Sequence, residues 1–320
     1  MLTVILLPMK FLSTRIIYSS LSLLILQLFS SPALAKKLYQ YQDSKGQWHY
    51  SDKPPQTKQK VAVKQLRVEH KKYITLQKTK KDGLRSYQVF NEYHAPVELR
   101  FFLKKSENVE TTPVLPKKFV VEHGLSEPLF TVSQKSKFRG WSYNLSYKYT
   151  VGSPFAQQGE NAVYLPPFAK DAKFRISQAF NGKFSHHNDY NRYAVDIVMP
   201  LKTPIHATRV GIVVDVRNDF FKNGLTQSHK SRANKIRILH DDGTMASYVH
   251  LSLETVQVYE GLKVSAGQLI GYSGNTGYST GPHLHFSIMQ NKGMNLVSIP
   301  FRFTTKKGAQ KPKRGDWLSW

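Results

Sequence analysis

The chain has 320 residues, a formal net charge of +25 at pH 7 and no cysteine. Its hydrophobic fraction of 40% is that of a folded protein rather than a disordered one, and its length suggests two or three domains. The lack of cysteine excludes disulfides, thiolate metal sites and a cysteine-linked lipid anchor. So basic a chain favours anionic polymers as partners. The alternative is that the positive charge serves only to keep the protein soluble.

The first 35 residues have the pattern of an export signal. Lys10 and Arg15 precede an apolar stretch over 16–29, and Ala33-Leu34-Ala35 fits a small-x-small cleavage site. The apolar stretch is shorter than the roughly 20 residues that a membrane-spanning helix needs, so cleavage is favoured over an uncleaved anchor. We therefore expect a protein exported to the periplasm or cell envelope.

A small β-hairpin module follows over residues 36–60. Leu38–Tyr41 and Gln47–Tyr50 are aromatic strands, and the turn signal Asp43-Ser44-Lys45-Gly46 lies between them. The unit resembles a β-module of unknown function that occurs near the N-terminus of many exported bacterial proteins. A hairpin of this size needs a neighbour to be stable. Gln56–Lys64 is polar and basic and is predicted to be a linker.

Residues 68–152 carry short apolar runs separated by turn signals, which predicts a β-sandwich-like domain. Tyr143–Tyr149 alternates apolar and polar side chains, the pattern of a half-buried strand. We find no catalytic cluster here, so a structural or binding role is expected. The predicted strands are Tyr73–Leu76, Tyr87–Phe90, Val97–Leu103, Phe119–Val121, Leu129–Val132 and Trp141–Tyr149.

The last domain is predicted over residues 168–303, after a connector at 154–167. Glycines mark the bends between its short strands and no long helical period is present, so the whole protein is predicted to be mainly β. Residues 304–320 are basic and contain Gly and Pro, and are predicted to form a loose tail. The predicted strands are Tyr193–Met199, Gly211–Val216, Lys235–His240, Met245–Leu251 and His283–Met289.

Two histidines two residues apart are weak evidence of a metal site by themselves. His283 and His285 lie on a predicted strand, so both side chains project from the same face. By the same argument Tyr248 and His250 share a face of another strand. Asp196 lies among apolar strand residues, where a buried carboxylate needs a metal or a cationic partner. Taken alone, a surface-facing aspartate on an alternating strand is the simpler interpretation of Asp196.

In combination, these motifs resemble the LytM/lysostaphin-type zinc metallopeptidases over residues 168–303. The family implies an antiparallel β-fold with an open groove and cleavage of peptide crosslinks in bacterial peptidoglycan. The resemblance depends on Phe184-Ser185-His186, Tyr193-Ala194-Val195-Asp196, Tyr248-Val249-His250-Leu251, Gly267-Gln268-Leu269-Ile270-Gly271, Ser273-Gly274-Asn275-Thr276-Gly277 and Gly281-Pro282-His283-Leu284-His285-Phe286.

The resemblance implies a role for each motif residue. His186, Asp196 and His285 match the zinc ligands, and His250 and His283 match the two catalytic histidines that do not bind the metal. Three protein ligands leave a position for water, as a catalytic zinc site requires. One histidine would accept the proton of the water and the other would donate to the oxyanion or leaving amine; the sequence does not say which does which.

Several features depart from the family pattern. Nine residues separate His186 from Asp196, a longer gap than many members have, and the insert at 188–191 is a candidate loop over the groove. His187 is the alternative first ligand. Phe184 stands where some relatives carry an oxyanion-assisting tyrosine. Lys202-Thr203-Pro204 replaces the usual Gly-Thr-Pro.

The remaining histidines of this region give no partner pattern. His240 precedes a hairpin turn signal and is predicted to be structural, whereas His206 and His229 are predicted to be ordinary surface or loop residues. Residues 220–232 form a long polar segment, for which a plain solvated loop is favoured over a wall of the groove.

We thus predict a zinc-dependent endopeptidase that hydrolyses peptide crosslinks of peptidoglycan. The alternatives are a catalytically inactive binding or activator protein on the same fold, a secreted toxin, and a nucleic-acid-binding protein. The last lacks every usual binding motif, so no nucleic-acid partner is expected. The domain order also suggests that removal of residues 36–150 would raise activity by relieving self-inhibition. The bond cleaved and the oligomeric state are left open.

Overall fold

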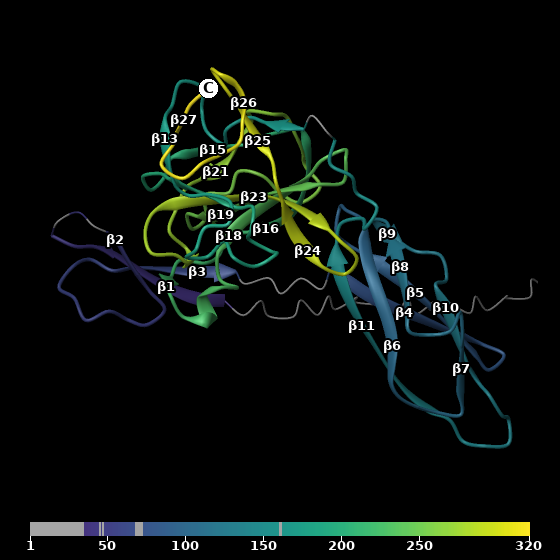
Figure 1. The fold of residues 1–320 in the computed structure, drawn as a ribbon. Coiled ribbons are helices and arrows are strands. Elements are labelled where there is room, and N and C mark those ends of the chain that lie inside the picture. The colour runs from purple at the N-terminus through teal and green to yellow at the C-terminus, as the bar shows by residue number, and fades with distance from the viewer. Residues whose placement is uncertain (1–34, 45, 47, 68–72, 160–161) are drawn as a thin grey trace, which may run out of the picture. The chain divides into compact units, whose positions relative to one another are not determined.

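The computed structural model describes residues 35–44, 46, 48–67, 73–159 and 162–320 (Figure 1). In these residues the regular structure is almost entirely β, which confirms the mainly β prediction; a single helical turn, η1 (Gln227–His229), is present among them. No helix in this part of the chain is long and apolar enough to cross a bilayer. The predicted export signal lies outside the described residues, except for Ala35, where the first strand begins.

The N-terminal module is a three-stranded antiparallel sheet rather than a hairpin alone. Its strands are β1 (Ala35–Gln42), β2 (Trp48–Ser51) and β3 (Ala62–Arg67), in the order β2-β1-β3. The predicted turn is present, with Gly46 N donating to Asp43 O at 3.0 Å. The linker prediction is wrong for 62–64, because these residues pair with β1 through the main chain, and a polar, basic strand gives no apolar signal in the sequence.

Two antiparallel sheets follow and share one apolar core. One has the order β4-β5-β10-β7, with β9 on β5, and the other the order β11-β6-β8. The predicted runs all fall within or next to these strands, whereas β7 and β9 were missed because they are short. The strands are β4 (Ile74–Lys81), β5 (Leu84–Asn91), β6 (Val97–Glu107), β7 (Val109–Thr112), β8 (Lys117–Val121), β9 (Gly124–Leu125), β10 (Phe130–Gln134) and β11 (Ser142–Val151).

A nine-stranded sheet forms the frame of the C-terminal region. Its order is β20-β16-β18-β19-β23-β14-β13-β27, with β24 also paired to β23, and every pair is antiparallel. Its strands are β13 (Phe174–Gln178), β14 (Val195–Val198), β16 (Gly211–Arg217), β18 (Asn234–Leu239), β19 (Met245–Leu251), β20 (Lys263–Val264), β23 (His283–Asn291), β24 (Leu296–Ile299) and β27 (Trp317–Leu318).

Three small sheets flank this frame. One contains β12, from the segment predicted as a connector, where Tyr164 is fully buried. Another joins β17 to β22 and so ties the predicted polar loop at 220–232 to the region before the His-x-His motif. The strands are β12 (Val163–Tyr164) with β25 (Arg302–Thr305) and β26 (Gly308–Gln310), β15 (Pro204–His206) with β21 (Leu269–Tyr272), and β17 (Asn223–Gly224) with β22 (Gly277–Tyr278).

Alternation along β23 shows how the large sheet is used. Leu284, Phe286 and Ile288 point into a core formed within the C-terminal region. On the opposite face the strand runs from the two histidines to Met289, which belongs to the core of the β4–β11 sheets together with Val214 and Met245. One face of the sheet therefore carries polar residues at one end and an apolar contact with the preceding sheets at the other.

The C-terminal segment is ordered, so the prediction of a loose tail is wrong. β27 pairs with β13, Ile176 N donates to Asp316 O at 2.9 Å, and Gly315 N donates to Ile176 O at 2.9 Å. Leu318 is 5% exposed, and Trp320 Nε1 donates to Phe168 O at 3.1 Å. Basic, Gly- and Pro-containing sequence suggested disorder, but two apolar anchors near the end fix the segment to the sheet.

Candidate metal centre and active-site groove

A row of residues in register across the sheet places the first two site residues side by side. Asp196 on β14 pairs with His285 on β23, and His285 pairs in turn with Val249 on β19. Directly opposed residues in antiparallel strands project from the same face. His283, two residues before His285, pairs with Val198 and lies on that face as well, as the strand alternation predicts.

His186 reaches this row from a loop rather than a strand. Its backbone N–H donates to Gly182 O at 2.9 Å, and its Nδ1 lies 3.0 Å from Ala179 O. Its Nε2 faces Asp196 Oδ1 at 3.3 Å, and the His186 side chain is fully buried. His187 is exposed at the groove edge, so the structure brings His186 and not His187 to the cluster.

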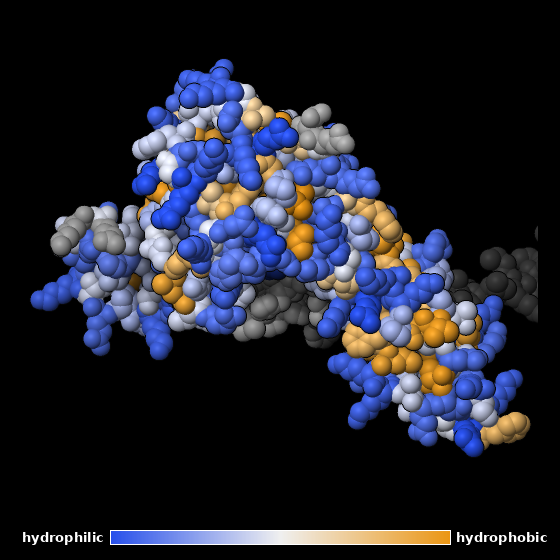
Figure 2. Space-filling view, in the orientation of Figure 1, coloured by the Kyte–Doolittle hydropathy of each residue, from blue (hydrophilic) through white to orange (hydrophobic). Residues whose placement is uncertain are grey.

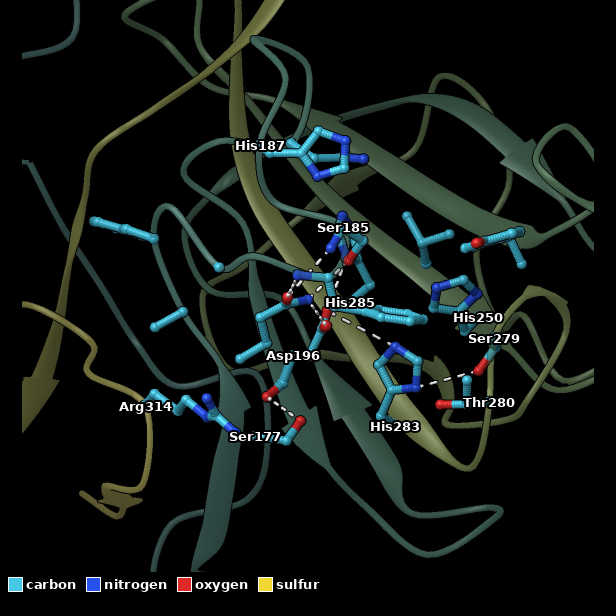
Figure 3. A pocket seen from close by; sticks show the side chains of 18 of the residues that line it. Ser177, Ser185, His187, Asp196, His250, Ser279, Thr280, His283, His285 and Arg314 are labelled. Carbon is cyan, nitrogen blue, oxygen red and sulfur yellow. Dashed lines mark hydrogen bonds and ion pairs between the residues drawn. The ribbon is translucent and has the colours of Figure 1, made fainter. Parts of the chain in front are cut away.

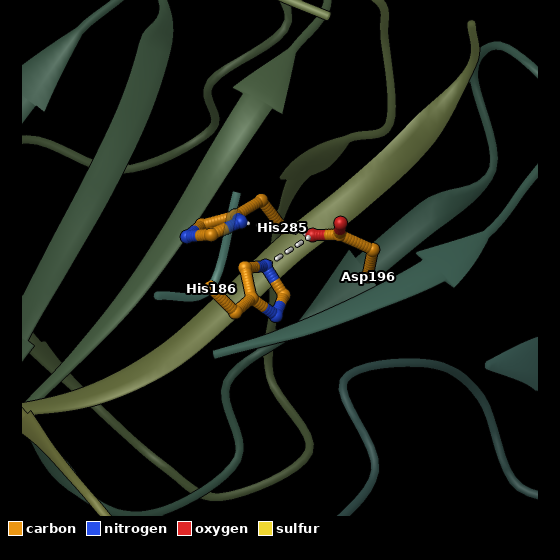
Figure 4. Close-up of side chains that lie close together, drawn as sticks. All are labelled: His186, Asp196 and His285. Carbon is orange, nitrogen blue, oxygen red and sulfur yellow. Dashed lines mark hydrogen bonds and ion pairs between the residues drawn. The ribbon is translucent and has the colours of Figure 1, made fainter. Parts of the chain in front are cut away.

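His186, Asp196 and His285 form a compact group of potential metal ligands (Figure 4). One ligand atom from each lies within 4.8 Å of the other two. Their side chains are 0%, 11% and 12% exposed, so water cannot solvate them fully. His186 Nε2 is buried with no hydrogen-bond partner, and because Nδ1 is engaged with a carbonyl, Nε2 is left with a free lone pair. Two imidazole nitrogens and a carboxylate are a donor set that fits a zinc ion.

The charge state of the cluster suits a cation. Burial by itself would raise the pKa of Asp196, but the adjacent His186 and His285 rings hold it well below its ordinary range. His285 Nδ1 lies 2.9 Å from Asp196 Oδ1, and burial lowers the pKa of His285 despite that partner. The ionised carboxylate places one negative charge beside the nitrogen atoms of two imidazole rings.

His250 and His283 adjoin the cluster without joining it (Figure 3). Their ring centroids are 4.6 Å apart, and that of His250 is 5.8 Å from His285. His250 Nδ1 lies 2.6 Å from Thr276 O and His283 Nδ1 lies 2.8 Å from Gly281 O, so a backbone carbonyl orients each ring, and His283 Nε2 lies 3.7 Å from Asp196 Oδ1. Burial, with repulsion from His283 and His285, lowers the pKa of His250 to about 3.

The expectation that Tyr248 and His250 share a face is wrong. Tyr248 lies in the core, where its hydroxyl bonds to Thr208 N and Oγ1 at 2.8 and 2.9 Å. His250 has a positive φ of 69° and follows a register shift between β18 and β19, so strand alternation stops before it. This irregularity turns both Val249 and His250 toward the groove.

Asp196 and His285 of the cluster line a groove of about 1390 Å³, whereas His186 is fully buried and is not part of its lining. The insert after His186 lines it through Asn188, Tyr190 and Asn191, in agreement with the expected loop over the groove. The preference for a plain solvated loop at 220–232 is wrong in part, because Lys230 and Ser231 also line the groove. His206, His229 and His240 lie outside it, and His240 is buried with Nδ1 2.8 Å from Val210 O.

Sequence reasoning missed two contributors to the groove. Gln178, at the end of β13, pairs with Asp196 in register and lines the groove, but a single glutamine has no motif around it. Lys311, Lys313 and Arg314 come from the segment predicted as a loose tail. Only the pairing of β27 with β13 brings them to the site, and a two-residue strand is not visible in the sequence.

Comparisons with known proteins agree with this site. Residues 190–296 match peptidase family M23, and residues 25–69 match a domain of unknown function, DUF4124. The M23 match begins after His186, so the place of that residue comes from the structure. The peptidoglycan DD-endopeptidase ShyA of Vibrio cholerae is 37% identical over 148 residues, which is 43% of this chain and 30% of ShyA.

Two further proteins are similar to part of this chain. The glycyl-glycine endopeptidase ALE-1 of Staphylococcus capitis is 40% identical over 38% of this chain and 31% of its own length. The solved catalytic domain of lysostaphin from Staphylococcus simulans is 30% identical and covers 44% of this chain and 88% of that domain, with a TM-score of 0.27. The matches to ShyA and ALE-1 span less than a third of either protein. Over residues 190–296 the chain carries a peptidase family M23 domain.

Proposed function

We propose that this protein is a zinc-dependent endopeptidase that hydrolyses peptide crosslinks of bacterial peptidoglycan. The observation that carries the proposal is that Asp196 and His285 line one open groove with two further histidines and form a compact cluster with the buried His186. ShyA and ALE-1, which are named as peptidoglycan and glycyl-glycine endopeptidases, support this substrate class. The catalytically inactive alternative would be expected to lack some of these five side chains, and all five are present.

In this proposal His186, Asp196 and His285 hold the metal. Three protein ligands leave a position open to substrate and water. When bound, zinc would supply Lewis acidity, polarising the scissile carbonyl and lowering the pKa of the attacking water. His250 and His283 would handle protons, because both rings line the groove beside the metal cluster and a backbone carbonyl orients each through Nδ1. One would accept the proton of the water, and the other would hydrogen-bond the developing oxyanion or the leaving amine.

We also propose that the protein acts outside the cytoplasm, in the periplasm or cell envelope, where peptidoglycan lies. The export-signal pattern of the first 35 residues and the match to DUF4124 support this. We further propose that residues 168–303 form the catalytic domain and that His186, Asp196 and His285 within it are the metal ligands.

The deciding experiment is digestion of purified peptidoglycan by the protein, with the metal content measured on the same sample. Zinc-loaded protein should release uncrosslinked muropeptides, and His285→Ala should lose both zinc and release. His229→Ala, outside the groove, is the matched control and should retain both. Bound zinc with no release from any crosslinked peptide would reject the proposal.

A further inference from the structure

We propose that Lys311, Lys313 and Arg314, together called the basic wall, bind a carboxylate of the peptide substrate. This rests on the proposed endopeptidase function and names the chemistry that the groove selects. The basic wall lies beyond residues 190–296, so it is not part of the M23 match. All three residues line the groove, and all three are exposed.

The basic wall is held in a fixed position. Pro312 within it is buried, and the pairing of Ile176 with Gly315 and Asp316 fastens the chain directly after it. Lys311 Nζ lies 5.6 Å from the centroid of Phe180, another groove residue. Before the basic wall β26 pairs with β25, and after it the chain is bonded to Ile176, so the side chains can bind an anion without ordering of the backbone.

Charge in the groove is one-sided. Among the described residues that line it, Asp196 is the single carboxylate, and it belongs to the metal cluster. Lys183 and Lys230 line the groove as well, so the basic wall does not stand alone. Within the described part of the chain, none of the three basic-wall side chains forms an ion pair. Their charge is therefore available to a ligand.

The position of the basic wall suits a substrate group away from the scissile bond. Figure 3 shows Arg314 and Ser177 on one side of Asp196, with His250 on the other. The surface over β26 and the adjoining C-terminal end is hydrophilic (Figure 2). Lysine and arginine donors recognise carboxylates, arginine with two parallel hydrogen bonds. A peptide that reaches across the metal cluster would thus place an acidic group on the basic wall.

The test compares two substrates that differ only in charge. The substrates are a crosslinked peptide dimer purified from peptidoglycan and the same dimer after conversion of its free carboxylates to amides. The variant is Lys311→Gln/Lys313→Gln/Arg314→Gln in the full chain. The matched control is Arg302→Gln/Lys306→Gln/Lys307→Gln, which removes the same charge from neighbouring exposed residues that do not line the groove.

We expect the wild type and the control to prefer the free acid in kcat/KM by about tenfold, since each exposed ion pair contributes about two- to fivefold. The basic-wall variant should lose this preference through KM, with kcat on the amidated dimer unchanged. Equal kcat/KM for both dimers in the wild type, or an unchanged preference in the variant, would overturn the proposal. So would equal losses in the control, because they would indicate only the general field of a basic protein.

Direct binding separates this proposal from the proposed function. Equilibrium titration of the two fluorescently labelled dimers with full-length His283→Ala measures affinity without turnover. Tighter binding of the free acid that disappears when the basic-wall substitutions are added supports the proposal, even if the wild type cleaves neither dimer. Equal affinity for the acid and the amide rejects it, even if both dimers are cleaved.

Discussion

Gln178 joins the carboxylate of the metal cluster to the loop that carries His186. Its Nε2 donates to Asp196 Oδ2 at 2.8 Å and to Ser185 Oγ at 2.7 Å. Its Oε1 accepts the backbone N–H groups of Phe184 and Ser185 at 3.1 and 3.3 Å. One side chain therefore fixes the orientation of a ligand on a strand relative to a ligand on a loop.

The first prediction is that Gln178→Ala weakens metal binding. Loss of a residue that orients a metal ligand typically lowers affinity by about 10–100-fold. Competition with a chromophoric chelator measures zinc affinity without reference to activity. Gln257→Ala, at an exposed glutamine outside the groove, should bind zinc as the wild type does. Wild-type zinc affinity in Gln178→Ala would show that the two ligands keep their places without it.

The second prediction concerns removal of the metal. An ion that binds only the folded state stabilises it, by about 2.7 kcal/mol when its free concentration is a hundred times Kd. A chelator should therefore lower the Tm, and added zinc should restore it. Asp196→Ala should have one Tm in the presence or absence of zinc. A zinc-dependent Tm in Asp196→Ala would place the stabilising ion elsewhere.

How far the sequence predicts this site depends on the kind of contact. His283 and His285 lie on one strand, so strand alternation was enough to place them together. Asp196 and His285 are 89 positions apart, and only the resemblance to a family linked them. Gln178 and the basic wall depend on the pairing of β13 with β14 and β27, which no local pattern encodes. Strand alternation failed for His250, which was predicted to share a face with Tyr248, because its positive φ interrupts the alternation.

The strands also differ in how well the sequence predicts them. Strands with an apolar face, such as β19, were predicted to the residue, because burial selects their side chains. β3 and β26 were missed, because their described side chains are mostly exposed and they join their sheets through main-chain pairing. Exposed strands of this kind carry little information in the sequence.

The third prediction is that His250→Ala separates catalysis from metal binding. His250 contacts the cluster but its Nδ1 is engaged with Thr276 O, and it is not among the three clustered ligand residues. Loss of a general acid or base typically lowers kcat by about 10²–10⁴-fold. We expect this loss at unchanged zinc content, both measured on the same sample. A variant that loses zinc in proportion to activity would make His250 a ligand instead.

The fourth prediction revises the expected self-inhibition. In the described residues, every residue that lines the groove falls between 177 and 314, so the structure gives no support to occlusion by residues 36–150. Those residues instead cover Val214, Met245 and Met289 on the sheet. Their deletion should lower the Tm and promote aggregation by exposing an apolar patch, without raising kcat/KM on soluble crosslinked dimers. A several-fold rise in kcat/KM would restore the self-inhibition hypothesis.

The fifth prediction concerns an ion cluster at the groove, which Lys235 and Tyr190 of the cluster help to line. Asp215 Oδ2 lies 2.7 Å from Lys235 Nζ and 3.5 Å from Arg237 Nη1, and Arg237 Nη2 donates to the hydroxyl of Tyr190 at 2.6 Å. Burial alone would raise the pKa of Asp215, but the charges of Lys235 and Arg237 lower it below its ordinary value. Ionisation of Asp215 therefore stabilises the folded state relative to the unfolded state.

The sign of this effect fixes its dependence on pH. Because the folded pKa is lowered, the contribution is complete above the pKa of an unfolded aspartate, about 3.9, and is lost as pH falls below it. Asp215→Asn leaves the buried Arg237 and the partly buried Lys235 without their anion and should lower the free energy of unfolding at pH 7 by up to about 3–5 kcal/mol. Denaturant unfolding of both proteins from pH 7 to pH 3 should show the difference shrinking below about pH 4. The control Asp171→Asn, at a carboxylate that is 75% exposed, should change the free energy of unfolding little at any pH. If the loss of stability in Asp215→Asn were the same at every pH, lost packing rather than lost charge would be its cause.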